Sequence, residues 1–487
     1  MTDMLATTRP GKLIINGEAV DAATGRTFRT MNPATEEAIC EVAEAGPEDV
    51  DRAVKAARAA FDGGPWARMR PAERQRILFR LGDLILEHAD ELGRLETLDN
   101  GKPIFESRQI DAPMAANCFH YFAGWATKLA GETLPVQPAF FTYTLREPLG
   151  VVGAIIPWNF PMIMVGWKCA PALAAGNCVV LKPAELTPLT AIRIGELALE
   201  AGLPPGVLNV LPGKGSVAGE AMVRHPGVDK ITFTGSTEVG KHIMKTGADT
   251  VKKVTLELGG KSPNIVFADA DLEAAVRGAT TGIFYGKGEV CAAGSRLLVE
   301  SSVHDEFVAK LAERAKRLVP ADPLDPKTRL GALVSAAQME KVLGYVDTGV
   351  SEGAKLVAGG KRQPVGGKGY FVQATVLDQV DNRMRVAQEE IFGPVLAVIR
   401  FEDVEDAVRK GNDSPYGLAA GVWTRDVNKA HAVARRLQAG TVWVNAYNFY
   451  DAGMPFGGYK ASGFGRDLGP ESLREYTQVK SVWISIE

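Results

Sequence analysis

A cysteine and a glutamate, each flanked by glycines, are the residues of this chain best suited to covalent chemistry. Cys291 lies in FYGKGEVCAAGSR (284–296), and Glu257 lies in LELGGKSP (256–263). The thiolate is the nucleophilic form of cysteine, and a covalent acyl intermediate also needs a group that activates water. We therefore predict acyl chemistry in which Cys291 and Glu257 supply these two roles.

Both residues also have simpler interpretations. A lone cysteine is usually a buried, inert thiol, and a glutamate at a domain junction is usually paired with a cation. None of the six histidines lies near the Cys291 segment in sequence, so a protease with a Cys-His pair has no local support. The surrounding motifs must decide between these interpretations.

Two short strings at predicted strand ends offer polar groups to a ligand. In PWNFP (157–161) the Asn159 amide can donate to a developing oxyanion, although a buried turn amide is the simpler role. In KPAE (182–185) both Lys182 and Glu185 can bind ribose hydroxyls, and the carboxylate would repel the extra phosphate of NADP. A solvated surface ion pair is the alternative for this second string.

Two glycine-rich turns are candidate phosphate loops. GKGSVAG (213–219) follows a strand and opens a helix, but its spacing differs from the dinucleotide fingerprint. FTGSTEVG (233–240) offers free backbone N–H groups and a Ser/Thr cap to a phosphate. An ordinary capped strand-to-helix turn explains either string equally well when it is taken alone.

The elements that must position these residues alternate between strand and helix. Short strands in 12–33 precede helical periodicity over 47–62, 71–100 and 103–130. The alternation that follows predicts right-handed βαβ units and a parallel sheet. We expect strands at 151–156, 178–182, 207–211, 230–234 and 254–257 and helices at 163–175, 187–201, 215–224 and 238–247.

A second alternating series predicts another α/β domain, which meets the first near 258–262. Doubly wound sheets bind ligands beyond the carboxyl ends of their strands, so the cleft between the domains is the expected active site. This series comprises strands at 297–299, 395–400, 419–423 and 441–444 and helices at 303–317, 335–350, 402–411 and 427–437.

Composition argues against several classes of partner. The 487 residues, 46% hydrophobic and 23% charged, are typical of a soluble globular protein with two or three domains. A formal charge of -3 without long Lys/Arg runs argues against nucleic acid and anionic membrane and favours a small molecule. The N-terminal segment MTDMLATTRPGKLIING lacks signal-peptide features, and no apolar run reaches the roughly 20 residues of a membrane span.

Cysteine usage and two unassigned segments complete the prediction. The cysteines are odd in number and form no CxxC pair, which predicts a reducing cytoplasm without a disulfide framework or a metal site. Segments 141–147 and 478–486 alternate as exposed strands do, and such edges can pair with another subunit. The five cysteines are Cys40, Cys118, Cys169, Cys178 and Cys291.

Taken together, the motifs resemble the aldehyde dehydrogenase superfamily over essentially the whole chain and in the same order. The likeness is to NAD-dependent, non-phosphorylating, tetrameric enzymes of the cytosolic and mitochondrial type. The strings that carry it are PWNFP, KPAE, FTGSTEVG, LELGGK, the cysteine segment, EEIFGP (389–394) and PFGGYKASG (455–463).

The resemblance implies an α/β fold with three parts. A Rossmann-type NAD-binding domain would comprise 1–129 and 149–258, and an α/β catalytic domain would comprise 259–460. A small β element formed by 130–148 and 461–487 would bridge the subunits of a homotetramer or homodimer.

The resemblance also implies catalytic roles. Cys291 would attack the aldehyde, and the Asn159 amide with the Cys291 backbone N–H would hold the oxyanion. Hydride would pass to NAD and leave a thioester, which water activated by Glu257 would hydrolyse. Lys182, counted with the catalytic set, would also bind the cofactor.

For NAD, the resemblance implies a set of contacts along one cleft. Lys182 and Glu185 would bind the adenosine ribose, Ser236 the pyrophosphate, and Glu390 the nicotinamide ribose. Phe392 would pack near the nicotinamide. The remaining expected contacts are Ile156, Trp158, Gly215, Gly235 and Leu258.

The family's substrate tunnel maps onto an apolar, aromatic set of residues. Such a lining suits aromatic or medium-chain aliphatic aldehydes. Aromatic cages also bind quaternary ammonium groups, so a betaine-aldehyde-like or amino-aldehyde substrate stays open. The expected lining residues are Phe160, Met164, Trp167, Tyr285, Phe449 and Tyr450.

One segment departs from the common family pattern. Many relatives carry Asn-Gln-Gly-Gln before the variable residue and the cysteine, whereas this chain has Gly286-Lys-Gly-Glu289. The Lys-Gly-Glu form also occurs in plant enzymes that oxidise hydroxycinnamaldehydes. If Glu289 points inward it would raise the thiol pKa, and Lys287 would offset this effect.

Two rival functions stay open at this point. A CoA-acylating semialdehyde dehydrogenase would transfer the acyl group to CoA, but such relatives tend to lack the carboxylate that Glu257 supplies. A non-catalytic, crystallin-like structural protein could keep the same fold. The joint presence of Cys291, Glu257, Asn159, Lys182 and Glu390 argues against it.

Overall fold

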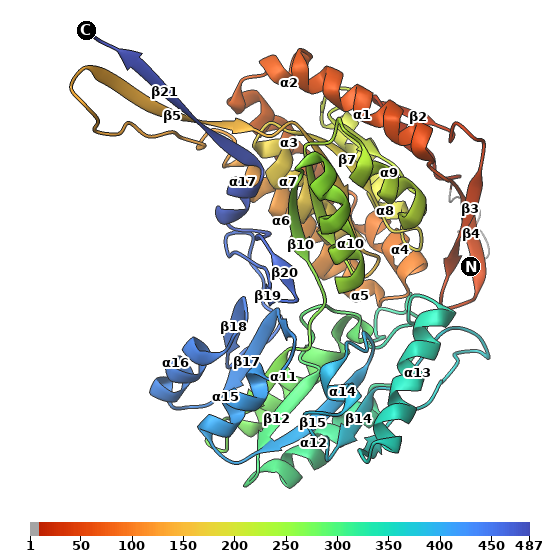
Figure 1. Cartoon of the computed structure of the whole chain (residues 1–487). Coiled ribbons are helices and arrows are strands. Elements are labelled where there is room, and N and C mark those ends of the chain that lie inside the picture. The colour runs from red at the N-terminus through yellow and green to blue at the C-terminus, as the bar shows by residue number, and fades with distance from the viewer. Residues whose placement is uncertain (1–8) are drawn as a thin grey trace.

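Two large β-sheets organise the chain in this computed structural model, which describes residues 9–487 (Figure 1). The first eight residues of the N-terminal segment lie outside the described range. Within that range no helix is long and apolar enough to cross a membrane. All five cysteines are free thiols in the described structure.

The first sheet has eight strands in the order β2-β1-β8-β7-β6-β9-β10-β20. Its five central strands, β8 to β10 in that order, are parallel, and the three outer strands pair antiparallel. Buried parallel strands read as continuous apolar runs, which is why periodicity locates them well. The strands are β1 (Leu13–Ile15), β2 (Glu18–Val20), β6 (Val151–Ile155), β7 (Cys178–Lys182), β8 (Leu208–Val210), β9 (Lys230–Thr234), β10 (Lys253–Glu257) and β20 (Gly463–Phe464).

The helices of this half follow the predicted alternation, with three differences. The stretch 215–224 is a π-helical turn, Gly215–Gly219, followed by the short helix α9. The stretch 71–100 is two helices, because the chain turns at His88. The stretch 103–130 contains a π-helical turn, Ser107–Asp111, between α5 and α6. The helices are α1 (Pro47–Asp62), α2 (Pro65–Arg68), α3 (Pro71–Glu87), α4 (Ala89–Asn100), α5 (Ile104–Glu106), α6 (Ala112–Ala123), α7 (Pro161–Ala174), α8 (Leu189–Glu200), α9 (Glu220–Arg224) and α10 (Thr237–Gly247).

The strand order of the first sheet creates a switch point between β6 and β9. From β6 the chain proceeds to β7 and β8 on one side, and it then returns to β9 and β10 on the other. Crevices at such switch points, beyond the carboxyl ends of the strands, are where open α/β sheets bind ligands. The turns after β6 and β9 contain Asn159 and Gly235, so both motifs lie at this crevice.

The second sheet has seven strands in the order β13-β14-β15-β12-β11-β17-β18, of which only β13 is antiparallel to its neighbour. The sequence did not predict β11, β13, β14 or the helix α11. The strands are β11 (Pro263–Val266), β12 (Arg296–Glu300), β13 (Lys355–Ala358), β14 (Thr375–Asp378), β15 (Val395–Phe401), β17 (Ala419–Trp423) and β18 (Thr441–Val444). The helices are α11 (Leu272–Phe284), α12 (His304–Arg317), α13 (Ala336–Ser351), α14 (Arg385–Gln388), α15 (Val404–Asn412) and α16 (Val427–Arg436).

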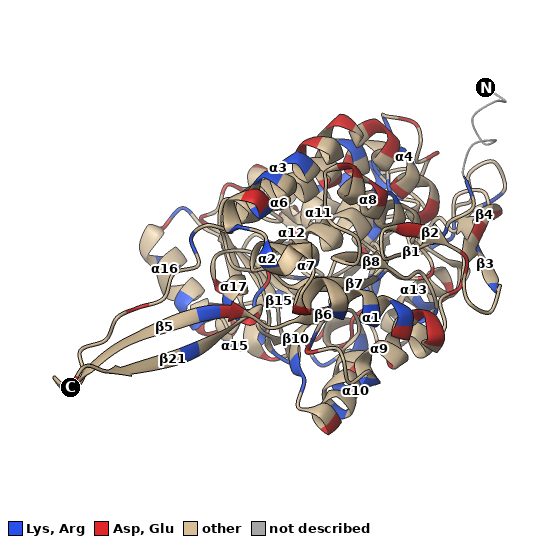
Figure 2. Ribbon diagram, turned by 90° about the horizontal axis from the view of Figure 1, so that it is seen from above, with Lys and Arg blue, Asp and Glu red and all other residues tan. Residues whose placement is uncertain are grey.

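A long two-stranded ribbon projects from the molecule in both views (Figures 1 and 2). It is formed by β5 (Phe140–Pro148) and β21 (Thr477–Ser485), which pair antiparallel along their whole length. These are the two segments predicted as exposed strands, and they pair with each other. Apolar side chains remain exposed on the ribbon, including Phe141 at 48% and Trp483 at 60%.

Small elements fill the rest of the chain. The short strand β20 lies within 461–487, the range assigned to the bridging element, yet it pairs with β10 of the first sheet. Figure 2 shows basic and acidic residues interspersed along the helices, in keeping with the small net charge. The remaining elements are β3 (Thr27–Asn32), β4 (Glu37–Ala43), β16 (Tyr416–Gly417), β19 (Tyr459–Lys460) and α17 (Glu471–Glu475).

Candidate active site

Cys291 lies where two cavities meet. It precedes β12, in the loop that follows α11, and its side chain is partly buried. One cavity of about 480 Å³ and another of about 250 Å³ both include Cys291, Phe160 and Met164 in their linings. A group attached to the sulfur is therefore accessible from either cavity. We call the larger one the apolar cavity and the smaller one the polar cavity.

The polar cavity is built at the switch point of the first sheet. Asn159 follows β6, Gly235 follows β9, and Glu257 is the last residue of β10. Of the predicted cofactor contacts, six line this cavity: Trp158, Gly235, Ser236, Leu258, Glu390 and Phe392. Two further lining residues, Gln338 and Lys341, lie outside every motif that the sequence singled out.

The other predicted cofactor contacts lie at the neighbouring strand end, outside the lining of the polar cavity. Lys182 ends β7, and its Nζ lies 3.4 Å from Oε2 of Glu185. A Cβ on Gly215 would lie 3.8 Å from the same Nζ, so this glycine leaves open space beside the lysine. The backbone N–H of Ile156 donates to the carbonyl oxygen of Lys182 at 3.1 Å.

Glycines at the domain junction allow Glu390 to approach closely. The backbone N–H of Gly260 donates to Oε1 of Glu390 at 2.9 Å. A Cβ on Gly259 would lie only 2.3 Å from Oε2 of Glu390, and one on Gly260 would lie 2.4 Å from the carbonyl oxygen of Cys291. Burial raises the pKa of Glu390 to about 7, while the Gly260 N–H opposes the shift.

The thiol of Cys291 is strongly protonated at rest. Burial is the largest cause, and the carboxylates of Glu390 and Glu257 add to it, so that the pKa of the thiol is raised to about 12. The backbone N–H groups of Ala292 and Cys291 lower the pKa in the opposite direction. The thiolate therefore needs either a proton acceptor or further stabilisation in order to form.

Glu257 is held in a buried position beside a lysine and an aspartate that the sequence did not single out. Burial and the nearby Asp467 raise its pKa well above the ordinary value, and Lys168 and Arg466 oppose this. Lys168 Nζ donates to Oδ2 of Asp467 at 2.6 Å. Oε2 of Glu257 is buried and has no hydrogen-bond partner among residues 9–487, and the side chain lines the polar cavity.

The amide of Asn159 is anchored to the cysteine loop. Its Nδ2 donates to the carbonyl oxygen of Glu289 at 2.9 Å, and the side chain lines the polar cavity beside Cys291. A primary amide has two N–H groups, and this bond uses one of them. Asn159 is 6% exposed, so its orientation is fixed by the surrounding protein.

All six residues predicted for the substrate side line the apolar cavity: Phe160, Met164, Trp167, Tyr285, Phe449 and Tyr450. Phe160 stacks on Tyr285 with ring centroids 6.0 Å apart, and Trp167 packs against Tyr450 at the same separation. Phe449 is 72% exposed, which places it at the open end. The sequence missed other lining residues, among them Met114, Ile163, Arg277, Trp423, Tyr447 and Phe456.

Comparison with known proteins now decides the family. The model of the aldehyde dehydrogenase family matches residues 19–482. The chain belongs to the aldehyde dehydrogenase family. Human mitochondrial aldehyde dehydrogenase is 51% identical to this enzyme over 477 residues, covering 98% of this chain and 92% of the human protein.

Solved structures agree with this assignment. The NAD+ complex of aldehyde dehydrogenase from Bacillus cereus is 50% identical and has a TM-score of 0.97, with 98% of this enzyme and 97% of that chain covered. An indole-3-acetaldehyde dehydrogenase in complex with NAD+ is 48% identical, with a TM-score of 0.97 and coverage of 99% and 98%. The protein is thus an NAD-dependent aldehyde dehydrogenase with the α/β fold that the sequence predicts.

The residues of this aldehyde dehydrogenase fit a dinucleotide. The polar cavity begins at a switch point, Ser236 caps the N-terminus of α10, and two glycines keep the Glu390 carboxylate close to the cysteine loop. The buried and unpartnered Oγ1 of Thr234 and Oε2 of Glu257 show that the cavity offers polar groups that the described protein does not use. Helix N-termini and free polar atoms of this kind suit a phosphate-bearing ligand.

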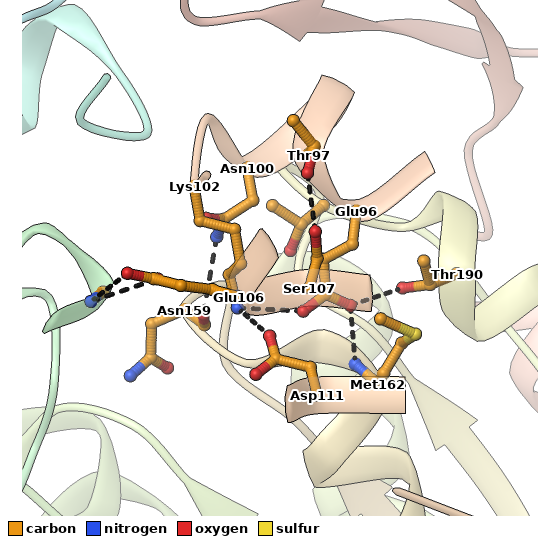
Figure 3. A network of polar contacts seen from close by, with 12 residues as sticks. Glu96, Thr97, Asn100, Lys102, Glu106, Ser107, Asp111, Asn159, Met162 and Thr190 are labelled. Carbon is orange, nitrogen blue, oxygen red and sulfur yellow. Dashed lines mark hydrogen bonds and ion pairs between the residues drawn. The ribbon is translucent and has the colours of Figure 1, made fainter. Parts of the chain in front are cut away.

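A buried acidic cluster supports the cysteine loop of the enzyme from the side of α4 to α6. Lys102 lies between the carboxylates of Glu96 and Asp111, at 2.9 and 2.6 Å from Nζ (Figure 3). Its ammonium also lies 4.3 Å from the centre of the Phe160 ring. The sequence did not predict this cluster. The one indication of it was the run of polar residues in LDNGKP (98–103), which is unusual at the end of a buried helix.

The position of Glu289 bears on the pKa of the thiol. Its Oε2 lies 2.8 Å from the Lys287 ammonium, and its Oε1 accepts from the backbone N–H of Val334. The carboxylates that raise the pKa of the thiol belong to Glu390 and Glu257. Glu289, which would raise this pKa only if it pointed inward, is not among them.

Proposed function

We propose that this enzyme oxidises aromatic or medium-chain aliphatic aldehydes to carboxylic acids, through an acyl intermediate on Cys291 that water activated by Glu257 hydrolyses. The observation that carries the proposal is the place of Cys291 at the junction of an apolar and a polar cavity. The carbonyl carbon of an aldehyde in the apolar cavity can reach the sulfur while its reacting hydrogen faces the polar one.

In the first step the thiol of Cys291 loses its proton to solvent, its sulfur attacks the aldehyde carbon, and the carbonyl oxygen becomes an oxyanion. The Asn159 amide and the Cys291 backbone N–H would donate to this oxyanion. Donors fixed in place before the charge develops stabilise the transition state most effectively. The anchoring of Asn159 to Glu289 supports this role.

The residues of the polar cavity and of the neighbouring end of β7 would hold NAD, which when bound accepts a hydride and so allows the oxyanion to collapse to a thioester. Lys182 and Glu185 would contact the adenosine ribose, Ser236 the pyrophosphate and Glu390 the nicotinamide ribose. Ile156, Trp158, Gly215, Gly235, Leu258 and Phe392 would complete the contacts.

Glu257 would then remove a proton from water as the water attacks the thioester. Its raised pKa makes the ionised carboxylate a stronger base than a free one. The buried position of Glu257, with one oxygen free of hydrogen bonds within the described chain, supports this role. Breakage of the C–S bond then releases the acid, and the sulfur takes the proton back from Glu257, which restores both the thiol and the carboxylate.

The lining of the apolar cavity favours a neutral substrate. Among the described residues that form it, none is an aspartate or glutamate, and Arg277 is its one charged member. A quaternary ammonium aldehyde would gain aromatic contacts there but no counter-charge. Neutral aromatic and aliphatic aldehydes are therefore preferred over a betaine-aldehyde-like or amino-aldehyde substrate.

We further propose that NAD is preferred over NADP and that the projecting ribbon takes part in self-association. The Glu185 carboxylate beside Lys182 would repel a 2′-phosphate, which supports the cofactor preference. The exposed apolar side chains of β5 and β21 support a homodimer or homotetramer. Sedimentation of the purified protein measures the second point.

A panel of aromatic, aliphatic and amino aldehydes, scored by kcat/KM with NAD and with NADP, tests the proposal. We expect the highest values for aromatic or medium-chain aldehydes with NAD. Product analysis with and without CoA separates hydrolysis from CoA acylation, and free acid formed without CoA supports the role of Glu257. No NADH formation with any aldehyde, together with intact NAD binding, would favour a structural, crystallin-like role.

A further inference from the structure

The loop before Cys291 is left-handed at three successive residues. The φ angles are 56° at Gly286, 61° at Lys287 and 73° at Gly288. A Cβ on Gly288 would lie 2.2 Å from the carbonyl oxygen of Gly393, so glycine is required there. Lys287 bears a side chain, and this backbone conformation is unfavourable for it. Its contacts must therefore compensate for the strain.

The ammonium group of Lys287 is buried and is paired with Glu289. Its Nζ lies 2.8 Å from Oε2 of Glu289, and both side chains are 1% exposed. The same Nζ donates to the carbonyl oxygen and to Oδ1 of Asn100, at 2.8 and 2.7 Å. Oε1 of Glu289 accepts from the backbone N–H of Val334 at 3.1 Å. Buried ion pairs are weak sources of net stability, so this pair calls for another explanation.

Both members of the pair are connected to Asn159. Nδ2 of Asn100 donates to the carbonyl oxygen of Trp158 at 2.7 Å, and Asn100 lies beside Asn159 in Figure 3. The carbonyl oxygen of Glu289 accepts from Nδ2 of Asn159 at 2.9 Å. The contacts therefore form a closed ring. On one side Lys287 reaches the backbone before Asn159 through Asn100, and on the other side the carbonyl oxygen of Glu289 holds the Asn159 amide.

The start of the same loop is also fixed. The backbone N–H of Gly286 donates to the carboxylate of Glu106, with 3.2 Å to Oε2 (Figure 3). Glu106 is buried in the acidic cluster that surrounds Lys102. The loop is thus held at its beginning by Glu106 and in its middle by the ion pair, directly before the nucleophile.

We propose that Lys287 and Glu289 are positioning residues, which hold the Asn159 amide in place to receive the oxyanion formed at Cys291. This inference rests on the proposed function, because it assumes that Asn159 stabilises that oxyanion. Neither residue lines the apolar or the polar cavity, so each would act through Asn159 and Asn100. The link between Lys287 and Glu289 is an ion pair, whereas the other links of the ring are hydrogen bonds, and a matched pair of amides could bridge the same two positions without charge.

The test uses the full-length protein and five variants. Lys287→Gln and Glu289→Gln each leave one buried charge without its partner, whereas the double variant replaces both charges with amides. Asn100→Ala cuts the ring without changing any charge. Glu405→Gln is the matched control, since it makes the same carboxylate-to-amide change in the exposed pair with Arg436.

Three measured rates distinguish a loss of Asn159 positioning from a general disruption of the active site. NADH formation with benzaldehyde and hydrolysis of p-nitrophenyl acetate without NAD both pass through a tetrahedral oxyanion on the sulfur. Alkylation of Cys291 by iodoacetamide does not. We expect both oxyanion-dependent rates to fall roughly tenfold or more in kcat in the two single-charge variants and in Asn100→Ala, since loss of one oxyanion donor costs about 10²–10³. Alkylation and the affinity for NAD should stay within about twofold.

The double variant should recover most of the lost rate, and Glu405→Gln should match the wild type. Unchanged ester hydrolysis in Asn100→Ala and in the single variants would overturn the inference, as would a parallel fall in alkylation. If the single variants do not fold, Asn100→Ala and the double variant decide by the same criteria. The ester reaction needs no aldehyde, so a wild type without NADH formation would instead contradict the proposed function.

Discussion

The two cavities that meet at Cys291 are built in different ways. The polar cavity consists of turns at the ends of adjacent strands, where backbone N–H groups, glycines and a few polar side chains face inward. The apolar cavity consists of bulky side chains from α6, α7, α11 and the loop after β18, which are far apart in sequence. A cofactor site can thus be encoded in short motifs, whereas a substrate site depends on how distant elements pack.

Removing the sulfur of Cys291 should abolish the reaction and leave ligand binding in both cavities intact. We expect Cys291→Ala to lower NADH formation by roughly 10⁴-fold or more, as loss of a covalent nucleophile does. Both cavities should persist, because alanine fills no new space. Steady-state kinetics measure the loss, and calorimetric titration should show NAD affinity within about threefold of the wild type. Substantial remaining turnover would contradict the role of Cys291.

Removing the base of the polar cavity should stop the reaction at a later step. We expect Glu257→Gln to lower steady-state turnover by roughly 10²–10⁴-fold, the usual contribution of a general base. The first turnover should still form NADH, because in the proposed mechanism Glu257 acts only after the acyl group is on the sulfur. Stopped-flow measurement should show a burst near one equivalent per active site, and mass spectrometry should detect the acylated protein. Loss of the burst together with turnover would place Glu257 in acylation instead.

A change confined to the apolar cavity should alter substrate choice and leave the cofactor side intact. Trp167→Leu removes ring contacts with Tyr450 and Phe456. The indole also offers a face to a substrate ring, and an aromatic contact of this kind contributes about 0.5–1.5 kcal/mol, so we expect kcat/KM for benzaldehyde to fall roughly two- to tenfold. The kcat/KM for acetaldehyde should change by no more than about twofold, and so should the KM for NAD. Equal losses for both aldehydes would indicate a general packing defect.

The pH dependence of Cys291 labelling should reflect the carboxylates of the polar cavity. Because the pKa of Cys291 is raised to about 12, the thiolate fraction increases with pH, by roughly tenfold per unit between about pH 6 and pH 10. Labelling by iodoacetamide should rise in the same way. Glu390→Gln removes a carboxylate that raises this pKa, so we expect labelling several-fold faster at a given pH. An unshifted profile would mean that burial alone sets the pKa.

Much of the fold was predictable because the central strands are apolar and buried. The strands expected at 178–182 and 419–423 coincide with β7 and β17. The helix α11 was missed, since its sequence LEAAVRGATTGIF is rich in glycine and threonine and so has weak helix propensity. The break at His88 was also missed, because helical periodicity continues across it.

The candidate site was predictable only where its residues lie in motifs. Asn159, Gly235 and Glu257 each end or follow a strand of one sheet, so chain order already places them together. The contact between Lys168 and Asp467 joins residues 299 positions apart, and no local spacing can reveal it. The sequence offered one indication of this contact, which is that Lys168 is the single charged residue of the otherwise apolar helix α7.

The burial of the thiol also affects how long the enzyme survives. Peroxides oxidise the thiolate form of cysteine far faster than the protonated form, and the later oxidation products do not revert on their own. A thiol whose pKa is raised to about 12 exposes almost no thiolate near neutral pH. The environment that makes Cys291 slow to ionise therefore also protects the resting enzyme from oxidative inactivation.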